Sequence, residues 1–379
     1  MARKRATDLS KTDMTMLVLI VLLVIFGLAV LFSSSEYNGR VRFGDSACYF
    51  KKQLFATALG MGVMYMVSSI DYHFFLRLGP VAYLISMFLS GAVLFVGQEI
   101  NGSKRWLNLG PLSFQPSEFA KVAVILFLAW QIERTKKATM GLGFMCRTIL
   151  TLLPIIGLVG SNNLSTAIIV MAITVLLLFL VHPKTKRFVV FACVVLVLAV
   201  IVVVYLKIQI SDMATSTDFR MRRIIAWLNP EANSDKDSYQ FLQGLYAIGS
   251  GGFFGKGLGN STQKLSAIPE AQNDMILTVI CEELGVFGAI LILCLFGFML
   301  YRLMFIARNA PDLYGSLIAA GIFSHIALQV ILNIAVVTGL IPTTGVTLPF
   351  ISYGGTAVVF LLAEMGIALG ISSKIELKD

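Results

Sequence analysis

Near its end the chain reads Gly339-Leu-Ile-Pro-Thr-Thr-Gly-Val-Thr-Leu-Pro-Phe-Ile-Ser-Tyr-Gly-Gly355, an uncharged run that joins two long apolar segments. Pro342, Pro349 and the pair of glycines at its end interrupt any helix, although nearly every residue is apolar or carries a small hydroxyl. At membrane depth, such irregular backbone is tolerated only where it is buried in protein or lines a polar cavity. The run therefore predicts an interior site in a membrane protein.

The composition of the whole chain agrees with this prediction. Hydrophobic residues make up 57% of the 379 residues and charged residues only 13%, whereas a soluble domain carries about 25% charged residues. We therefore predict an all-α integral membrane protein, with residues 1–379 as a single polytopic domain. A helix needs roughly 20 residues to cross the hydrocarbon core. About ten spanning helices are predicted, at 14–33, 52–70, 79–97, 119–132, 147–161, 164–181, 188–206, 275–300, 314–338 and 350–372.

The basic residues of the short loops set the expected orientation, because cytoplasmic loops carry an excess of lysine and arginine. Their distribution favours both termini in the cytoplasm, and the net charge of +9 suits an anionic inner leaflet. The segment 206–274 then forms a large extracellular loop between helices seven and eight. Within it, 218–227 has the pattern of an amphipathic interfacial helix and 238–248 shows a second helical periodicity.

Nucleic-acid and metal functions find no support in the sequence. No basic stripe with interleaved aromatic residues indicates nucleic acid. The five cysteines and three histidines are scattered without metal-ligand spacing, and the odd number of cysteines argues against a disulfide framework. No cofactor is therefore predicted, and the sequence leaves open whether a divalent ion takes part.

Asp274 is the carboxylate best suited to chemistry. It lies in Ile268-Pro-Glu-Ala-Gln-Asn-Asp-Met-Ile276, where the polar loop meets an apolar segment. A carboxylate in the first turn of a helix is favoured by the helix dipole and stays ionised, so it could accept a proton from a sugar hydroxyl. The position fits an ordinary helix cap equally well. Glu282 and Glu283 lie about two turns deeper, where we expect a structural polar network, although Glu282 could also lie beneath Asp274.

A second polar cluster lies in the segment 98–118 and in the helix that follows it. Pro116 favours a helix start, which places Glu118 and Lys121 on one helix face. With nearby basic residues they would form a cationic vestibule suited to a lipid-linked phosphate or pyrophosphate, although each arginine alone equally fits a snorkelling side chain. The candidate substrate-binding residues are Trp106, Glu118, Lys121, Lys104, Arg105, Arg220, Arg223 and Glu270.

The glycine-rich run at 249–259 does not match a phosphate-binding loop. Lys256 is followed by Gly257 rather than by serine or threonine, and no strand precedes it. Turns that let backbone segments pack closely are the favoured interpretation. A nest of backbone amides that binds an anion is the alternative.

Six strings together resemble the SEDS family (shape, elongation, division and sporulation) of FtsW/RodA/SpoVE-type membrane proteins. They are spread over most of the chain in the family's order, at Asn101–Trp106, Gln115–Lys121, Tyr239–Gly259, Gln263–Asp274, Glu282-Glu-Leu-Gly285 and Gly339–Gly355. The stretches Phe43-Gly-Asp-Ser and Gly259-Asn-Ser-Thr-Gln-Lys-Leu265 look more like the FtsW/SpoVE branch than like RodA.

The resemblance implies a multi-pass protein of the bacterial cytoplasmic (inner) membrane, with ten transmembrane helices and cytoplasmic termini. It implies a peptidoglycan glycosyltransferase that polymerises lipid II through β-1,4 bonds, releases undecaprenyl pyrophosphate and works with a class B penicillin-binding protein. By motif, Asp274 falls on the family's essential aspartate and Trp106 on its outer-loop tryptophan. Glu118 and Lys121 fall on its Glu–Lys pair.

Two departures from the family pattern concern the site. Asn163 stands where the family usually has a carboxylate, and Gln272-Asn273-Asp274-Met275 replaces the commoner His-Thr-Asp-Phe. Two other functions stay open. One is a flippase for lipid-linked precursors, since broken helices and intramembrane acids fit a transporter. The other is a noncatalytic scaffold that activates a penicillin-binding protein. The sequence does not distinguish a role in division, elongation or sporulation.

Overall fold

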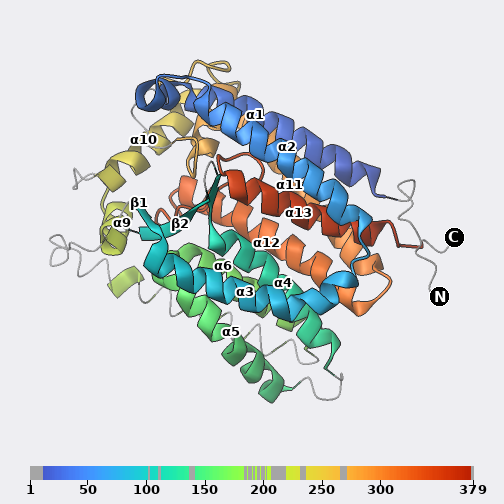
Figure 1. The fold of residues 1–379 in the computed structure, drawn as a ribbon. Coiled ribbons are helices and arrows are strands. Elements are labelled where there is room, and N and C mark those ends of the chain that lie inside the picture. The colour runs from blue at the N-terminus through green and yellow to red at the C-terminus, as the bar shows by residue number, and fades with distance from the viewer. Residues whose placement is uncertain are drawn as a thin grey trace.

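The apolar stretches form helices because a helix satisfies its own backbone hydrogen bonds, which a membrane interior requires. Figure 1 shows their arrangement in the computed structural model, which describes residues 12–100, 103–109, 112–135, 141–182, single positions between 186 and 205, 219–230, 236–264 and 271–376. The helices are α1 (Met14–Phe43), α2 (Cys48–Ser69), α3 (Phe74–Val96), α4 (Pro116–Glu133), α5 (Leu142–Asn162), α6 (Leu164–Val181), α9 (Phe219–Leu228), α10 (Lys236–Gly251), α11 (Ile276–Asn309), α12 (Leu313–Val337) and α13 (Gly355–Ser372).

The predicted all-α membrane fold is confirmed. Within the described ranges, seven helices are long and apolar enough to cross a membrane, namely α1, α3, α5, α6, α11, α12 and α13. The predicted spans 52–70 and 119–132 correspond to α2 and α4, which are not among these seven. The predicted span 188–206 lies largely outside the described residues, so the number of ten spans stays a prediction. Several predicted boundaries were wrong: α1 continues to Phe43 and α11 to Asn309, α3 and α5 begin earlier than predicted, and α13 begins only at Gly355. α9 and α10 overlap the two short helices expected in the 206–274 segment.

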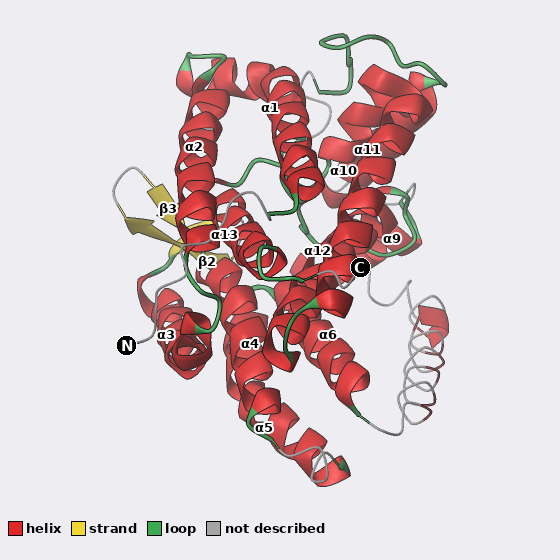
Figure 2. Ribbon diagram, turned by 90° about the vertical axis from the view of Figure 1, so that its right-hand side faces the viewer, coloured by secondary structure: helices red, strands yellow, loops and turns green. Residues whose placement is uncertain are grey.

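A small β-sheet between α3 and α4 was not predicted. It consists of β1 (Gln98–Ile100), β2 (Ser103–Leu109) and β3 (Leu112–Phe114), paired antiparallel in the order β1-β2-β3. Trp106 lies opposite Gln98 in the β1–β2 ladder. Two of the strands have three residues each, which is too short for an alternating pattern to be recognised in the sequence. Figure 2 shows β2 and β3 beside the start of α13, where β3 contacts that helix.

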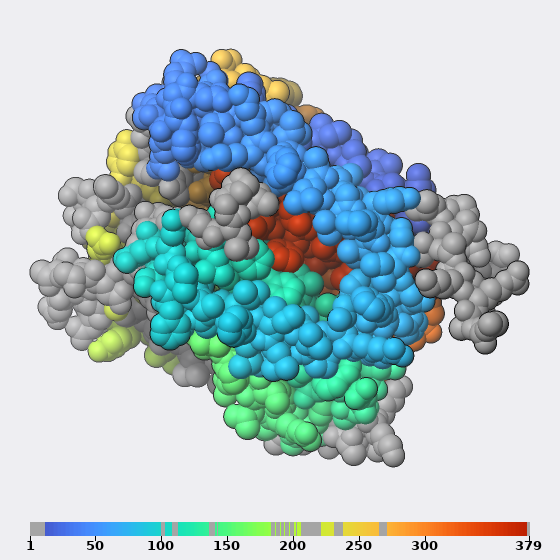
Figure 3. Space-filling view, in the orientation of Figure 1, coloured from blue at the N-terminus to red at the C-terminus, as the bar shows by residue number. Residues whose placement is uncertain are grey.

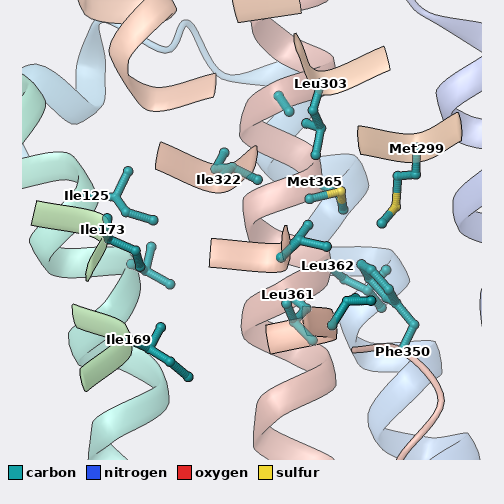
Figure 4. Packing of buried hydrophobic residues seen from close by; sticks show 14 of the residues in the cluster. Ile125, Ile169, Ile173, Met299, Leu303, Ile322, Phe350, Leu361, Leu362 and Met365 are labelled. Carbon is teal, nitrogen blue, oxygen red and sulfur yellow. The ribbon is translucent and has the colours of Figure 1, made fainter. Parts of the chain in front are cut away.

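The centre of the bundle is a continuous apolar core. Figure 4 shows Ile125 of α4, Ile173 of α6 and Ile322 of α12 within it, and all three are almost fully buried. α4, α6 and α12 pack against one another, while α2 packs mainly against α13 and α3 mainly against α4. This central packing fixes the positions of the helices that carry the polar residues of the site.

The glycine-rich run packs backbone against backbone with a kink in α11. The backbone amides of Lys256 and Gly257 donate to the carbonyls of Glu282 and Glu283, each over 2.9 Å. Gly285 has a left-handed conformation at φ 69°, and a Cβ there would lie 2.3 Å from a backbone oxygen of the run. The close-packing interpretation of the run therefore agrees with this geometry, and these two amides are not available to an anion.

Candidate functional site

A polar cavity of about 790 Å³ opens where α4, α6 and α11 begin and α12 ends. It brings together residues from seven helices, the small sheet and the broken run. Its lining includes six basic side chains and two carboxylates. These charged residues are Arg42, Lys51, Lys52, Arg105, Lys121, Arg223, Glu118 and Asp274.

The broken run forms one wall of this cavity, through Gly345 to Thr347 and Tyr353 to Gly355. Hydrogen bonds from outside the run fix its irregular backbone. The Ser165 hydroxyl donates to the carbonyl of Thr344 over 2.7 Å, and the amide of Gly354 donates to Gln53 Oε1 over 3.1 Å. The sequence predicted an interior site at this run, and the run lines this polar cavity.

Asp274 lies in this cavity, just ahead of α11. The N-cap of α11 is Met275, so Asp274 precedes the helix rather than capping it. Asn333 of α12 is fully buried, and its Nδ2 donates to the carbonyls of Asp274 (2.9 Å) and Val346 (2.8 Å). A Cβ added at Gly345, where φ is 73°, would lie 3.9 Å from Asp274 Oδ2. Asn333 thus joins the backbone that carries the carboxylate to the broken run beside it.

Glu118 and Lys121 form an ion pair at the cavity wall, in the first two turns of α4. Lys121 Nζ lies 3.0 Å from Glu118 Oε2, and the two residues are only 1% and 7% exposed. A charge buried this deeply is costly unless it is paired, and the contact between the two side chains offsets part of that cost at the cavity wall. Pro116 occupies the first turn, as the sequence predicted.

The other predicted binding residues divide into three groups. Trp106, Arg105 and Arg223 line the cavity; Arg105 Nε donates to the carbonyl of Asn162 over 2.8 Å. Lys104 is not among the lining residues and lies opposite Glu99 in the β1–β2 ladder. The Arg220 side chain and Glu270 lie outside the described residues, although the backbone of Arg220 belongs to α9.

Sequence reasoning missed part of the cavity lining. Arg42, at the end of α1, and Lys51 and Lys52, in the first turn of α2, also line it. Lys51 donates to Asp45 over 2.8 Å, and this hydrogen bond lowers the pKa of Asp45 below its ordinary value. The sequence showed these residues only as basic groups of a short loop. The sequence signal that could have identified them as lining residues is that three cations fall within eleven residues, in a loop next to the predicted vestibule.

Two tyrosines meet at the same part of the cavity lining. Tyr49 and Tyr353 pack edge to face with ring centroids 5.0 Å apart. Burial, with smaller contributions from Tyr49 and Cys48, raises the pKa of Tyr353 to about 12. Its hydroxyl therefore stays protonated at neutral pH and can donate a hydrogen bond.

The two departures from the family pattern have local explanations. Asn163 accepts a hydrogen bond from the amide of Thr166 (3.2 Å) and so caps α6, a role that asparagine fills as well as aspartate. Gln272 accepts a hydrogen bond from Asn38 of α1 (2.8 Å), and its carbonyl accepts one from the amide of Tyr353 (2.9 Å). Both residues therefore support the walls of the cavity that they line.

Glu282 and Glu283 form a structural network away from the cavity lining. Glu282 accepts hydrogen bonds from Lys256 Nζ (2.7 Å) and from Ser261. Glu283 pairs with the buried Lys264 over 2.8 Å. These contacts agree with the expected network, because they tie the segment after α10 to α11. Among the residues that the structure describes, no group of three histidines, cysteines or acids could hold a metal ion.

The fold and the site together define a polytopic membrane protein with a cationic cavity and a carboxylate at one end of its helical bundle. The sequence model of the FtsW/RodA/SpoVE family, described as cell cycle protein, matches residues 13–376. The chain belongs to this family.

Curated relatives cover nearly the whole chain. Stage V sporulation protein E of Bacillus subtilis is 36% identical over 97% of this chain and 98% of its own length. The probable peptidoglycan glycosyltransferase FtsW of Trichlorobacter lovleyi is 34% identical over 97% of this chain and 95% of its own length. The family and the leaning toward its FtsW/SpoVE branch were both predicted from the sequence motifs.

Solved structures share the fold. A chain from a peptidoglycan synthase complex, solved in a study of how polymerization and crosslinking are coordinated, aligns with a TM-score of 0.77 at 27% identity, over 95% of this chain and 97% of that one. The rod shape determining protein RodA of Thermus thermophilus aligns with a TM-score of 0.68 at 25% identity, over 97% and 98%.

Proposed function

We propose that this chain is a peptidoglycan glycosyltransferase that polymerises lipid II in the bacterial cytoplasmic membrane. The observation that carries the proposal is that one cavity contains Asp274, the buried Glu118–Lys121 pair and five further basic side chains. Its full-length relatives include proteins named probable peptidoglycan glycosyltransferase. The cavity end faces the outside, both termini face the cytoplasm, and 206–274 forms the extracellular loop.

The reaction is a single displacement. The Asp274 carboxylate takes the proton from the C4 hydroxyl of the acceptor sugar as that oxygen attacks the anomeric carbon of the donor chain. The bond from this carbon to the pyrophosphate oxygen breaks, and undecaprenyl pyrophosphate leaves with the electron pair. Attack from the opposite face inverts the α-linked donor into a β-1,4 bond.

The basic residues stabilise the charge that develops on the leaving group. Lys121, Arg105 and Arg223 come from α4, β2 and α9, and Arg42, Lys51 and Lys52 come from α1 and α2. Several cations suit the reaction, because the donor and the acceptor each carry a pyrophosphate. Trp106 and the protonated Tyr353 supply an aromatic face and a hydroxyl at which sugar rings can bind.

The lipid chains of both substrates enter from the bilayer. Figure 3 shows a hollow between α2 and α3, with α13 visible at its floor. Phe55 of α2 and Ala357 of α13 line the cavity, so it reaches toward this face. The crosslinking partner is a class B penicillin-binding protein, by analogy with the peptidoglycan synthase complex that shares the fold.

The test is polymerisation of labelled lipid II by the purified protein with its penicillin-binding partner. Asp274→Asn should abolish polymer, because an amide cannot take the proton. Glu36→Gln should keep it, since Glu36 is an exposed carboxylate that pairs with Arg40 outside the cavity. Normal polymerisation by Asp274→Asn would refute the assignment of the base. Transfer of lipid II across vesicles without polymer would indicate a flippase, and neither activity would indicate a scaffold.

A further inference from the structure

A second cavity, of about 630 Å³, lies at the opposite end of α4 from the Glu118–Lys121 pair. Its lining residues are Phe127, Trp130, Gln131, Arg134, Thr135, Gly143, Phe144, Arg147 and Thr151, and we call it the α4–α5 cavity. Arg134 follows Glu118 by sixteen residues, which corresponds to about 24 Å along a helix. This distance is close to the thickness of the hydrocarbon core, so the cavity lies at the other lipid–water boundary.

The packing of the helices leaves this space open. α4 packs mainly against α3, and α5 packs mainly against α6 and α3. Stacked rings form one wall, with Tyr83 and Phe127 at 4.4 Å and Phe127 and Trp130 at 5.6 Å between centroids. The guanidinium of Arg134 lies over the Trp130 ring at 5.0 Å, which holds the charge at the mouth of the cavity.

The lining of the cavity is charged where it is exposed and apolar where it is buried. Arg134 and Arg147 are exposed and carry the charge, whereas Phe127 and Phe144 are more buried and apolar. The lining contains no carboxylate. Gln131 Oε1 is buried without a hydrogen-bond partner among the described residues, and such a group is costly unless something satisfies it.

We propose that the α4–α5 cavity binds one anionic phospholipid of the leaflet opposite the active cavity. Its phosphate lies between Arg134 and Arg147, and its acyl chains follow Phe127 and Phe144 into the membrane. Basic pockets between membrane helices suit such headgroups. Snorkelling explains two exposed arginines but not an aromatic-walled space between two helices. The volume is that of a ligand site.

Binding can be followed through Trp130, because the chain has only two other tryptophans, Trp106 and Trp227. In the full-length protein with both of those changed to phenylalanine, phosphatidylglycerol with brominated acyl chains should quench Trp130 more strongly than brominated phosphatidylcholine does. Arg134→Gln combined with Arg147→Gln should weaken the phosphatidylglycerol affinity about thirty-fold, at roughly one order of magnitude or less for each arginine. Arg308→Gln is the matched control, since Arg308 is an exposed arginine in the last turn of α11, at the same end of the bundle.

Four outcomes would overturn the proposal. Equal quenching of Trp130 by the two brominated lipids would show that lipids reach the cavity without any preference for an anionic headgroup. An equal loss of affinity in Arg308→Gln would show an unspecific surface charge. Competition by inorganic phosphate without any dependence on acyl chains would assign the cavity to a free anion. Protection of Trp130 from both brominated lipids would show another occupant. The lipid comparison uses unmutated arginines, so it decides the question even if the double variant fails to fold.

Discussion

The buried Glu118–Lys121 pair allows a test that separates structural from catalytic roles. Glu118→Gln and Lys121→Met each leave one charge without its partner, whereas the double variant removes both charges and keeps similar side-chain volumes. We expect the single variants to lose both stability and activity. The double variant should recover stability but not activity, because polymerisation uses the charges themselves.

The expected magnitudes follow from the geometry. At 3.0 Å and an effective dielectric constant of about 20, the attraction between the two charges is about 5 to 6 kcal/mol. Desolvation of the two ions offsets much of this attraction, because both residues are more than nine-tenths buried. Removing one partner from such a pair costs about 3 to 5 kcal/mol, whereas replacing both with neutral groups is close to neutral. Both residues line the polar cavity, so we expect the lower end, about 3 kcal/mol per single variant.

The assay has two readouts on the same preparations. Unfolding in a denaturant series gives the stability of the wild type and three variants, and lipid II polymerisation gives the activity. Recovery of both stability and activity in the double variant would show that the pair only supports the fold. Single variants that cost less than about 1 kcal/mol would refute the claim that the charges are desolvated. Lys52→Met changes a lining residue of α2 outside the pair and so controls for the loss of a lining cation.

Two further predictions concern single residues. Asn333→Ala removes the hydrogen bond to the Asp274 carbonyl. It should lower kcat about 10- to 100-fold with little change in KM, because it displaces the proposed base rather than a binding group. A rise in KM with an unchanged kcat would contradict this prediction. Burial raises the pKa of Asp71, but hydrogen bonds from Lys374 and His73 lower it to about 2, from an ordinary value of 3.8. Because the folded-state pKa is the lower one, this stabilisation is present above pH 4 and lost as the pH falls toward 2. Asp71→Asn should therefore cost about 1 kcal/mol at neutral pH, after allowance for the half-exposed carboxylate, and thermal melts should show the difference vanish near pH 2.

The sequence was most informative where one local pattern has one structural meaning. Long apolar stretches predicted the spanning helices, Pro116 predicted the start of α4, and the broken run predicted an interior site. The i, i+3 spacing of Glu118 and Lys121 is enough to predict their contact, because residues at that spacing share a helix face. Each of these inferences needed only neighbours in the chain.

What the sequence could not show depends on segments far apart in the chain. Nothing local in Asn333 indicates that it bonds to Asp274, fifty-nine residues earlier. Arg42 and Lys52 look like ordinary loop cations until the packing of α1 and α2 brings them to the cavity. Strands of three residues carry too little pattern to be recognised. Such long-range placement had to come from the three-dimensional structure.

The cavity combines one fixed wall with one open side, and this asymmetry suits a proton acceptor at the position of Asp274. Asn333, Gln53 and Gln272 each bond to the backbone of the broken run or of the segment ahead of α11. These ties come from α12, from α2 and from the segment that carries Asp274, so three parts of the chain hold the same irregular backbone. A proton acceptor must be held within a few tenths of an ångström to be effective, and a backbone fixed from three directions can do so. The lipid chains, in contrast, need a route that opens to the bilayer, and the hollow between α2 and α3 offers such a route (Figure 3). The broken run can therefore stay rigid while substrates move past it.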